Sequence, residues 1–293
     1  MPVGELAALA AATLWGFTSV FFFSVAAQRI GALRVNLLRL PLGWALLGLT
    51  LLVTGQSPIT DGWSLGLLAV SGVIGLSIGD LAYFAAMRRL GARLAVLMLS
   101  LAPLFAAGIG AVLLHEVPGP LAGTGIVLTL GGVFWVVLER RDEGMPAGHH
   151  LSGMLLGLGS AFCQGFGLVL AKWGMAGGLH PWAASWLRMT AGTAAIWLIA
   201  VVAGHRRDLD LRGSLRLAWP QVVGGAVMGP FLGASLSLVA AQRTEVGVAA
   251  TLMATTPIIV IPLVMVTERY RPSWRALVGT LLAFVGIGLL FTR

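Results

Sequence analysis

An aspartate, Asp80, lies inside the apolar stretch GLSIGDLAYFAAMRRL of residues 75–90. A charged carboxylate in the hydrocarbon of a membrane is costly, so such a residue usually forms an ion pair or takes part in binding or proton transfer. Asp80 precedes Arg88 by eight residues, which is about 12 Å along an α-helix. We therefore expect Asp80 near mid-depth, where it binds a substrate amine or a coupling proton, or forms an ion pair with Arg39. A helix break after Gly79 is a third role that the sequence leaves open.

A tryptophan and a glutamine form a second candidate pair for substrate binding. Trp15 lies about 15 Å into the first apolar stretch if that helix starts near residue 5, and Gln164 occupies the equivalent place in the second half of the chain. An indole offers a stacking face and an amide offers a donor and an acceptor, which suits a zwitterionic or aromatic substrate. The alternative is structural: Trp15 packs against lipid or a neighbour, and Gln164 hydrogen-bonds across helices.

Prolines and hydroxyl groups complete the candidate set. Pro103 and Pro257 fall at mid-depth, where a proline removes a backbone donor, bends the helix and exposes a carbonyl to a site. The alternative is a packing kink, in which the hydroxyl groups of Ser100, Thr255 and Thr256 satisfy the backbone again. The predicted substrate-binding residues are Trp15, Asp80, Tyr83, Ser100, Gln164, Ser235, Ser237 and Thr255.

Two arginines stand at equivalent places in the two halves of the chain. Arg39 and Arg188 each lie about one turn into an apolar stretch, and a planar guanidinium can grip a carboxylate or a phosphate. Their closeness to the ends of their stretches favours a structural role, in which they extend towards the membrane surface or form ion pairs. Glu116 and Glu268, at the ends of later stretches, are interpreted as helix caps or ion-pair partners.

No pattern of residues indicates a metal site, a cofactor or catalysis. His149 and His150 lack a cysteine or carboxylate partner at ligand spacing, and the single cysteine, Cys163, excludes an intramolecular disulfide and a cysteine-clustered metal site. No segment matches a glycine-rich phosphate loop or a nucleophile elbow. We therefore expect that the protein is not an enzyme, uses no cofactor and is not driven by ATP hydrolysis.

The composition indicates a protein that crosses a membrane many times. Of the 293 residues, 58% are hydrophobic and 10% are charged, against about 25% charged in soluble domains. The net charge of +8 comes from basic residues in short connections that are not interleaved with aromatic residues, so nucleic acid is not an expected partner. Membrane lipids are the expected surroundings.

Charged or turn-rich connections divide the chain into ten apolar stretches, each long enough to cross about 30 Å of hydrocarbon. They lie near residues 5–27, 36–54, 64–87, 94–113, 120–138, 151–173, 183–203, 218–240, 247–267 and 274–292. We therefore predict an all-α membrane protein with ten transmembrane helices. The polar segment ERRDEGMPAGHH at 139–150 separates five stretches from five.

The two halves resemble each other in sequence. At an offset of 149 residues, LWGF at 14–17 aligns with CQGF at 163–166. At an offset of about 154 residues, GARLAVLMLSLAP at 91–103 aligns with EVGVAATLMATTP at 245–257, which matches the two mid-depth prolines. Several matches in the same order indicate an internal repeat.

An odd number of spans in each half has a topological consequence. The second half must start on the opposite side of the membrane from the first, so the two repeats are inverted. Secondary transporters use this arrangement, with a site near the midplane between the repeats and access that alternates between the two sides. We predict two five-helix repeats, at residues 1–142 and 150–293, around a central cavity.

The sequence resembles the EamA family of the drug/metabolite transporter superfamily over essentially its whole length. The matching segments are LWGF, LLRLP, LSLAPLFAAGIGAVLLHEVPGPLAGTGIVLTLGGV and ATTPIIVIPLVMVTERYRPSWRALVGTLLAFVGIGL. The resemblance implies a ten-helix exporter of small metabolites, and among members of the family it favours the amino-acid exporters. Other members carry nucleotide sugars, drugs and other metabolites, so the motifs alone do not identify the substrate.

The leading hypothesis is therefore a secondary transporter that exports a small molecule, with an amino acid as the first choice. One alternative is a multidrug or organic-cation exporter, for which a buried acidic residue is the expected feature. A membrane enzyme or a lipid-handling scaffold is the other, but an enzyme should cluster its catalytic side chains at one interface. Two fused repeats can enclose a site without a second chain, so a monomer is sufficient.

The arginines indicate how the chain is oriented in the membrane. They concentrate in alternate connections, at Arg29, Arg34, Arg88, Arg89, Arg93, Arg140, Arg141, Arg206, Arg207, Arg212, Arg216, Arg269 and Arg271. By the positive-inside rule these connections face the cytoplasm, which places both termini on the non-cytoplasmic side of the plasma membrane, the inner membrane of a bacterium. The family commonly has both termini inside and a basic connection between its second and third helices, but here that connection, VTGQSPITDGW, has no basic residue.

Overall fold

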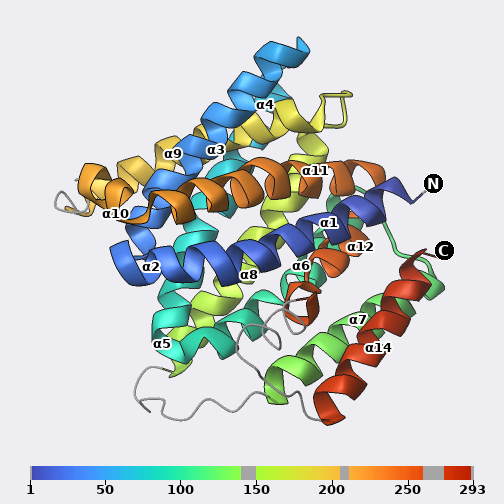
Figure 1. Cartoon of the computed structure of the whole chain (residues 1–293). Helices are drawn as coiled ribbons and strands as arrows, with labels where there is room; N and C mark the ends of the chain where they lie inside the picture. Colours follow the sequence, from blue (N-terminus) through green and yellow to red (C-terminus); the bar gives the residue numbers. More distant parts are fainter. Residues whose placement is uncertain (1, 140–149, 205–210, 260–273, 292–293) are drawn as a thin grey trace.

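The computed structural model describes residues 2–139, 150–204, 211–259 and 274–291, and every regular element within them is a helix. In chain order the helices are α1 (Val3–Phe17), η1 (Thr18–Phe23), α2 (Ser24–Ile30), α3 (Ala32–Thr54), α4 (Gly62–Gly72), η2 (Val73–Gly79), α5 (Asp80–Leu99), α6 (Ala102–Leu113), α7 (Pro120–Glu139), α8 (His150–Gly174), α9 (Pro181–Val202), α10 (Leu211–Ala226), η4 (Val227–Gly233), α11 (Ala234–Arg243), α12 (Val246–Met253) and α14 (Trp274–Phe291). The three η elements are π-helical turns. Figure 1 shows these helices gathered into one bundle.

Long apolar helices make up most of the described chain. Six stretches are long and apolar enough to cross a membrane: Val3–Ala27, Leu33–Thr54, Gly62–Leu90, Leu151–Gly174, Pro181–Val202 and Leu211–Arg243. Shorter apolar helices occupy Ala102–Leu113, Pro120–Trp135, Val246–Ile259 and Leu277–Phe291. A helix satisfies its own backbone hydrogen bonds, which hydrocarbon requires. The helical fold and these stretches fit the predicted all-α membrane protein.

Two of the expected spans contain a break. α5 continues through the expected connection between residues 87 and 94 and ends at Leu99, so the break lies at Ser100 and Leu101. The equivalent break follows α12 at residues 254–255, and both spans were expected to be continuous. Pro103 and Pro257 are each the second helical residue after a break. A proline is tolerated there because the first turn of a helix has no partner for its N–H groups.

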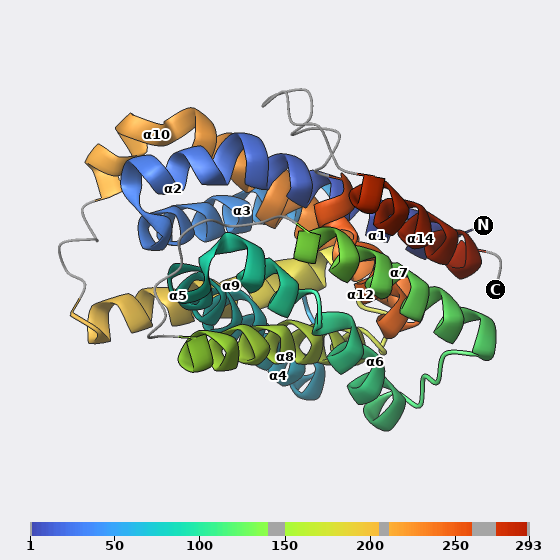
Figure 2. The same ribbon diagram turned by 90° about the horizontal axis from the view of Figure 1, so that it is seen from below.

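The two halves of the chain contact each other in equivalent pairs. α1 packs along α11, and α8, the second-half equivalent of α1, packs along α4, η2 and α5. α3 packs against α9, α6 against α12 and α7 against α14, and each of these is a pair of equivalent helices. Figures 1 and 2 both show α7 and α14 side by side on one flank of the bundle. The packing therefore reflects the internal repeat.

Equivalent glycines bring the two halves into close contact. A Cβ at Gly43 of α3 would lie 2.6 Å from Cβ of Pro230 in η4, and a Cβ at Gly192 of α9 would lie 3.1 Å from Cβ of Leu76 in η2. The two glycines are 149 residues apart and their partners are 154 residues apart, so the contacts correspond. Small residues allow helix backbones to approach closely in lipid.

The π-helical segments η2 and η4 are equivalent as well. Each begins at a valine and ends at a glycine, their sequences VIGLSIG and VMGPFLG share the pattern Val-x-Gly-x-x-x-Gly, and they lie 154 residues apart. The extra residue in a π turn rotates the residues that follow by about 100° relative to a continuous α-helix. The first residue after this rotation is Asp80 in the first repeat and Ala234 in the second.

Candidate binding site between the two repeats

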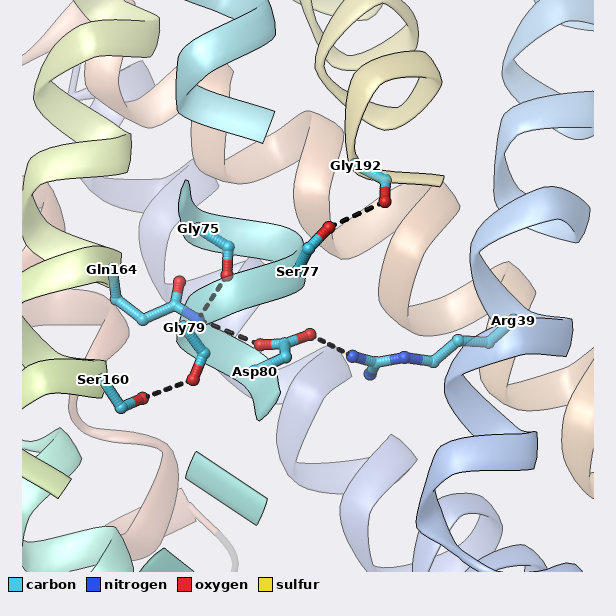
Figure 3. A network of polar contacts seen from close by, with 8 residues as sticks. All are labelled: Arg39, Gly75, Ser77, Gly79, Asp80, Ser160, Gln164 and Gly192. Atoms are coloured by element: carbon cyan, nitrogen blue, oxygen red, sulfur yellow. Dashed lines mark hydrogen bonds and ion pairs between the residues drawn. The ribbon is translucent and has the colours of Figure 1, made fainter. Parts of the chain in front are cut away.

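Asp80 begins α5 directly after η2, and its carboxylate is held from two sides (Figure 3). Arg39 of α3 forms an ion pair with Asp80 Oδ2, and Gln164 Nε2 of α8 donates to Asp80 Oδ1 at 3.0 Å. The side chains of Arg39 and Asp80 are 14% and 16% exposed. The guanidinium also lies over the ring of Phe23, with Cζ 4.9 Å from the centroid. The buried pair thus neutralises its own charges, which is one of the roles considered for Asp80.

Carbonyl groups of η2 accept hydrogen bonds from α8. Gln164 Nε2 donates to Gly75 O at 3.2 Å, and Ser160 Oγ donates to Gly79 O at 2.8 Å. A π turn changes the backbone hydrogen bonds of the helix. Neighbouring side chains can donate to the carbonyl groups that lose their backbone partner. Gln164 therefore holds both the π turn and the carboxylate that follows it (Figure 3).

Two serines donate hydrogen bonds in the opposite direction, from the first repeat to backbone carbonyl groups of the second. Ser77 Oγ donates to Gly192 O of α9 at 2.7 Å, and Ser71 Oγ donates to Gly167 O of α8. Both serines are fully buried. Neither these serines nor Ser160 were among the site residues predicted from the sequence. Of the three serines, only Ser77 lies within the repeated Val-x-Gly-x-x-x-Gly pattern, so that pattern is a sequence signal for Ser77 alone.

Arg188 of α9 has no comparable partner. It is 6% exposed, and its guanidinium makes no hydrogen bond or ion pair with any residue that the structure describes. A Cβ at Gly75 would lie 3.5 Å from Arg188 Nη2 and 4.0 Å from Gln164 Oε1, so both side chains reach the same turn of η2. Within the described part of the chain, neither the ion pair nor the surface position expected for Arg188 is thus observed. At the position equivalent to Asp80, the second repeat has Ala234, which carries no carboxylate.

Trp15 and Gln164 occupy equivalent places at the two π segments. A Cβ at Gly233, the last residue of η4, would lie 2.5 Å from Trp15 Nε1. A Cβ at Gly79, the last residue of η2, would lie 3.4 Å from Gln164 Nε2. Gln164 bonds to the Asp80 carboxylate, whereas no hydrogen bond among the described residues joins Trp15 to it. Substrate contact by either residue stays a prediction.

The other predicted substrate-binding residues lie outside this network. Tyr83 follows Asp80 by one turn on α5, and its ring centroid is 5.7 Å from that of Phe84. Four hydroxyl groups donate to backbone carbonyl groups three or four residues earlier in the chain: Ser100 to Val96, Ser235 to Phe231, Ser237 to Ala234 and Thr255 to Leu252. Such bonding satisfies a hydroxyl in apolar surroundings. A role in binding for these five residues stays a prediction.

The broken helix after α12 compensates its proline locally. Pro257 has no N–H to donate to the carbonyl of Met253, and Thr256 Oγ1 donates to that carbonyl at 2.9 Å. The same hydroxyl lies 3.3 Å from Ala12 O of α1. This is the structural alternative considered for the prolines. No three His, Cys, Asp or Glu side chains gather into a metal site within the described part of the chain.

A second polar cluster joins the repeats at the end of the bundle where α1 begins. Glu116, after α6, forms an ion pair with Lys172 of α8 and accepts a hydrogen bond from Val246 N of α12 at 2.8 Å. Lys172 Nζ also donates to Thr244 O at 2.6 Å, and Thr244 Oγ1 donates to Glu5 Oε1 at 3.1 Å. We call this cluster the Glu116 lock. Glu116 thus both caps a helix and forms an ion pair, which are the roles interpreted for it.

Glu116→Gln is expected to weaken the Glu116 lock, because it removes the charge that faces Lys172. Hydrogen bonds to charged groups contribute about 1–3 kcal/mol, so the thermal unfolding midpoint of the purified protein in detergent should fall. Arg243→Gln is the matched control, since Arg243 is exposed at the end of α11 near the same cluster. Equal midpoints for the two variants would contradict the lock as a stabilising contact. Glu268, the other glutamate interpreted as a cap, lies outside the described residues.

Comparison with known proteins places this arrangement in a family. The model of the EamA-like transporter family matches the chain twice, at residues 2–138 and 151–292. One solved crystal structure of a protein shares the fold, with a TM-score of 0.77 over 98% of this chain and 95% of that chain at 20% identity. No curated protein matches the sequence. Because the two family matches cover nearly the whole chain, this protein belongs to the EamA-like transporter family.

Proposed function

We propose that the protein is a secondary transporter that exports a small metabolite, with an amino acid as the first choice, by alternating access. In this proposal ten transmembrane helices form two inverted five-helix repeats in the plasma membrane. The observation that carries the proposal is the buried network of Asp80, Arg39 and Gln164, which bridges the two repeats at a π-helical turn. Ionisable side chains inside a membrane protein, at irregular turns between repeats, are typical of transport sites.

The contacts between the repeats support a mechanism of access from one side at a time. The Glu116 lock ties the first repeat to the second at the end where α1 begins. The site opens to that side only when the ion pair between Glu116 and Lys172 separates. The breaks at residues 100–101 and 254–255 divide equivalent helices into two parts. These interruptions are the proposed hinges, because a short break absorbs a change in backbone angles.

An organic-cation exporter is the competing function within transport. It requires a carboxylate that is available to a cation, but Asp80 is already neutralised by Arg39 and bonded to Gln164. Arg188 adds a positive charge nearby, which repels cations. The charge balance therefore favours an anionic or zwitterionic substrate. A membrane enzyme or a lipid-handling scaffold is the competing function of another class.

Flux through reconstituted protein tests the proposed function. Proteoliposomes are loaded with each radiolabelled amino acid in turn, and efflux is compared with that from protein-free liposomes with and without a pH gradient. The expected result is efflux of at least one amino acid above the protein-free level. Efflux of a labelled organic cation without efflux of any amino acid would favour the competing exporter. The absence of flux for both classes would contradict small-molecule export.

The proposed orientation is tested separately with fusion proteins. Because the arginine-rich connections are expected to face the cytoplasm, alkaline phosphatase fused after Arg293 should be active and green fluorescent protein at the same place should not fluoresce. The same two reporters fused within the arginine-rich connection at 206–207 should show the opposite pattern. A fluorescent carboxy-terminal fusion would reverse the orientation without affecting the transport proposal.

A further inference from the structure

We infer that Arg188 binds the carboxylate of the transported substrate, an inference that rests on the proposed transport function. Arg188 lies seven residues into α9, as Arg39 lies seven residues into α3, which is about 10 Å from each helix start. At that depth Arg188 is 6% exposed. No described residue accepts a hydrogen bond from its guanidinium or offers it a negative charge.

Among the described side chains of this site, one positive charge has no counter-charge. Arg39 and Asp80 neutralise each other, and Gln164 is neutral, so the guanidinium of Arg188 is the remaining charge among these four side chains. A buried charge without a partner is unfavourable, and it becomes favourable when a charge of opposite sign binds beside it. The free site is therefore preorganised for an anionic group.

The difference between the two repeats explains why no described residue supplies that anion. Both repeats have an arginine at the equivalent place and a π-helical segment of the same pattern. In the first repeat the residue after the π segment is Asp80, which forms the ion pair. In the second repeat it is Ala234, which has no polar side chain. The second repeat thus keeps the cation and lacks the carboxylate, which leaves this role to a ligand.

Neighbouring groups fit a carboxylate that carries an amine. Ser185 lies three residues before Arg188 and therefore on the same face of α9; it is buried, and its hydroxyl has no partner among the described residues. Gln164 Oε1, beside the same turn of η2, accepts no hydrogen bond from a described residue. One guanidinium and one hydroxyl match a singly charged carboxylate, and the amide oxygen can accept from an ammonium group. A doubly charged phosphate would leave a negative charge unpaired.

The requirement for a carboxylate on the ligand is tested by measuring ligand binding to the purified protein in detergent. Each of the amino acids and its carboxamide is added, and the shift of the thermal unfolding midpoint with concentration gives an apparent affinity. The expected result is that at least one amino acid stabilises the wild type and that its carboxamide does not. Arg188→Gln should weaken binding of that amino acid about 30-fold or more. Arg188→Lys should bind with intermediate affinity, because it keeps the charge and loses the planar fork.

Two further variants separate the charge of Arg188 from its packing. Without ligand, Arg188→Gln should have a higher midpoint than the wild type, because it removes an uncompensated buried charge. Ala234→Asp places a carboxylate at the equivalent of Asp80 and should weaken amino-acid binding while Arg188 is still present. Arg216→Gln, at an exposed position of α10, is the control and should change neither the midpoint nor the affinity.

The inference is overturned if amino acids and their carboxamides shift the midpoint equally, if neither shifts it, or if inorganic phosphate protects the protein and carboxylates do not. It is also overturned if Arg188→Gln lowers the unfolding midpoint, since the guanidinium then has a structural partner. The same holds if Arg188→Gln and Ala234→Asp both bind the amino acid with full affinity. Failure of the proposed function gives a different result. In that case amino acids still bind through Arg188, and the proteoliposomes show no efflux.

Discussion

Asp80→Asn is expected to lower the free energy of unfolding by about 3 kcal/mol, because it leaves the buried guanidinium of Arg39 without a counter-charge. The thermal unfolding midpoint of the purified protein measures this loss. Asp61→Asn is the matched control: Asp61 is an exposed helix cap that accepts a hydrogen bond from Ser64 N at 2.9 Å, and asparagine caps a helix equally well. Its midpoint should match that of the wild type.

The double variant Arg39→Gln/Asp80→Asn tests whether the loss comes from the ion pair. A neutral pair leaves no buried charge unpaired, so the double variant should recover most of the stability that either single variant loses. An Asp80→Asn protein as stable as the wild type would contradict the pair as a stabilising contact. Flux distinguishes the remaining roles: normal flux with normal pH dependence assigns Asp80 a structural role, and an altered pH dependence assigns it to coupling.

Gly72→Ala is expected to separate α4 from α9 and to disturb Arg188. A Cβ at Gly72 would lie 2.0 Å from the carbonyl oxygen of Arg188 and 2.8 Å from its carbonyl carbon. These are backbone atoms, so the helices themselves must move apart, at a cost of about 1–3 kcal/mol for an overpacked contact. We expect a lower unfolding midpoint together with weaker amino-acid binding, because the guanidinium beside η2 is displaced.

Gly66→Ala is the matched control for this clash. Gly66 lies on the same helix and is exposed, with no atom within 4 Å of its built Cβ. Alanine has a higher helix propensity than glycine by about 1 kcal/mol, so Gly66→Ala should be at least as stable as the wild type. If Gly72→Ala behaves in the same way, the close contact between α4 and α9 does not exist in the folded protein.

The sequence predicted the helical class and the equivalence of the two halves better than it predicted where helices break. Arg88 and Arg89 look like a connection between spans, yet α5 continues through them to Leu99. Charged residues indicate that a segment lies near water, but a helix can continue through such a segment. The breaks occur instead at positions 100–101 and 254–255, just before the two prolines.

How well the sequence indicates the hydrogen-bond partner of a site residue depends on how far along the chain that partner lies. The hydroxyl of Ser235, whose role in binding stays a prediction, donates to the carbonyl of Phe231 four residues earlier, which is the nearest acceptor on an apolar helix. The amide of Gln164 bonds to Asp80, 84 residues earlier. Mid-depth alone does not separate these two cases, because it does not specify which helix face meets which neighbour.

The sequence by itself determined that the chain is a helical membrane protein with two related halves, because hydrocarbon requires long apolar helices and a repeat keeps its pattern of residues. It also indicated Asp80 and Gln164 as polar residues at mid-depth, and Arg39 and Arg188 as equivalent arginines about one turn into their stretches. Only the tertiary structure decided that Asp80 is neutralised by Arg39 and that Arg188 has no counter-charge among the described residues. The physical reason is twofold. The π turns rotate the residues that follow them, and the close contacts at glycines fix which faces of neighbouring helices pack together. The pairing of buried charges depends on both.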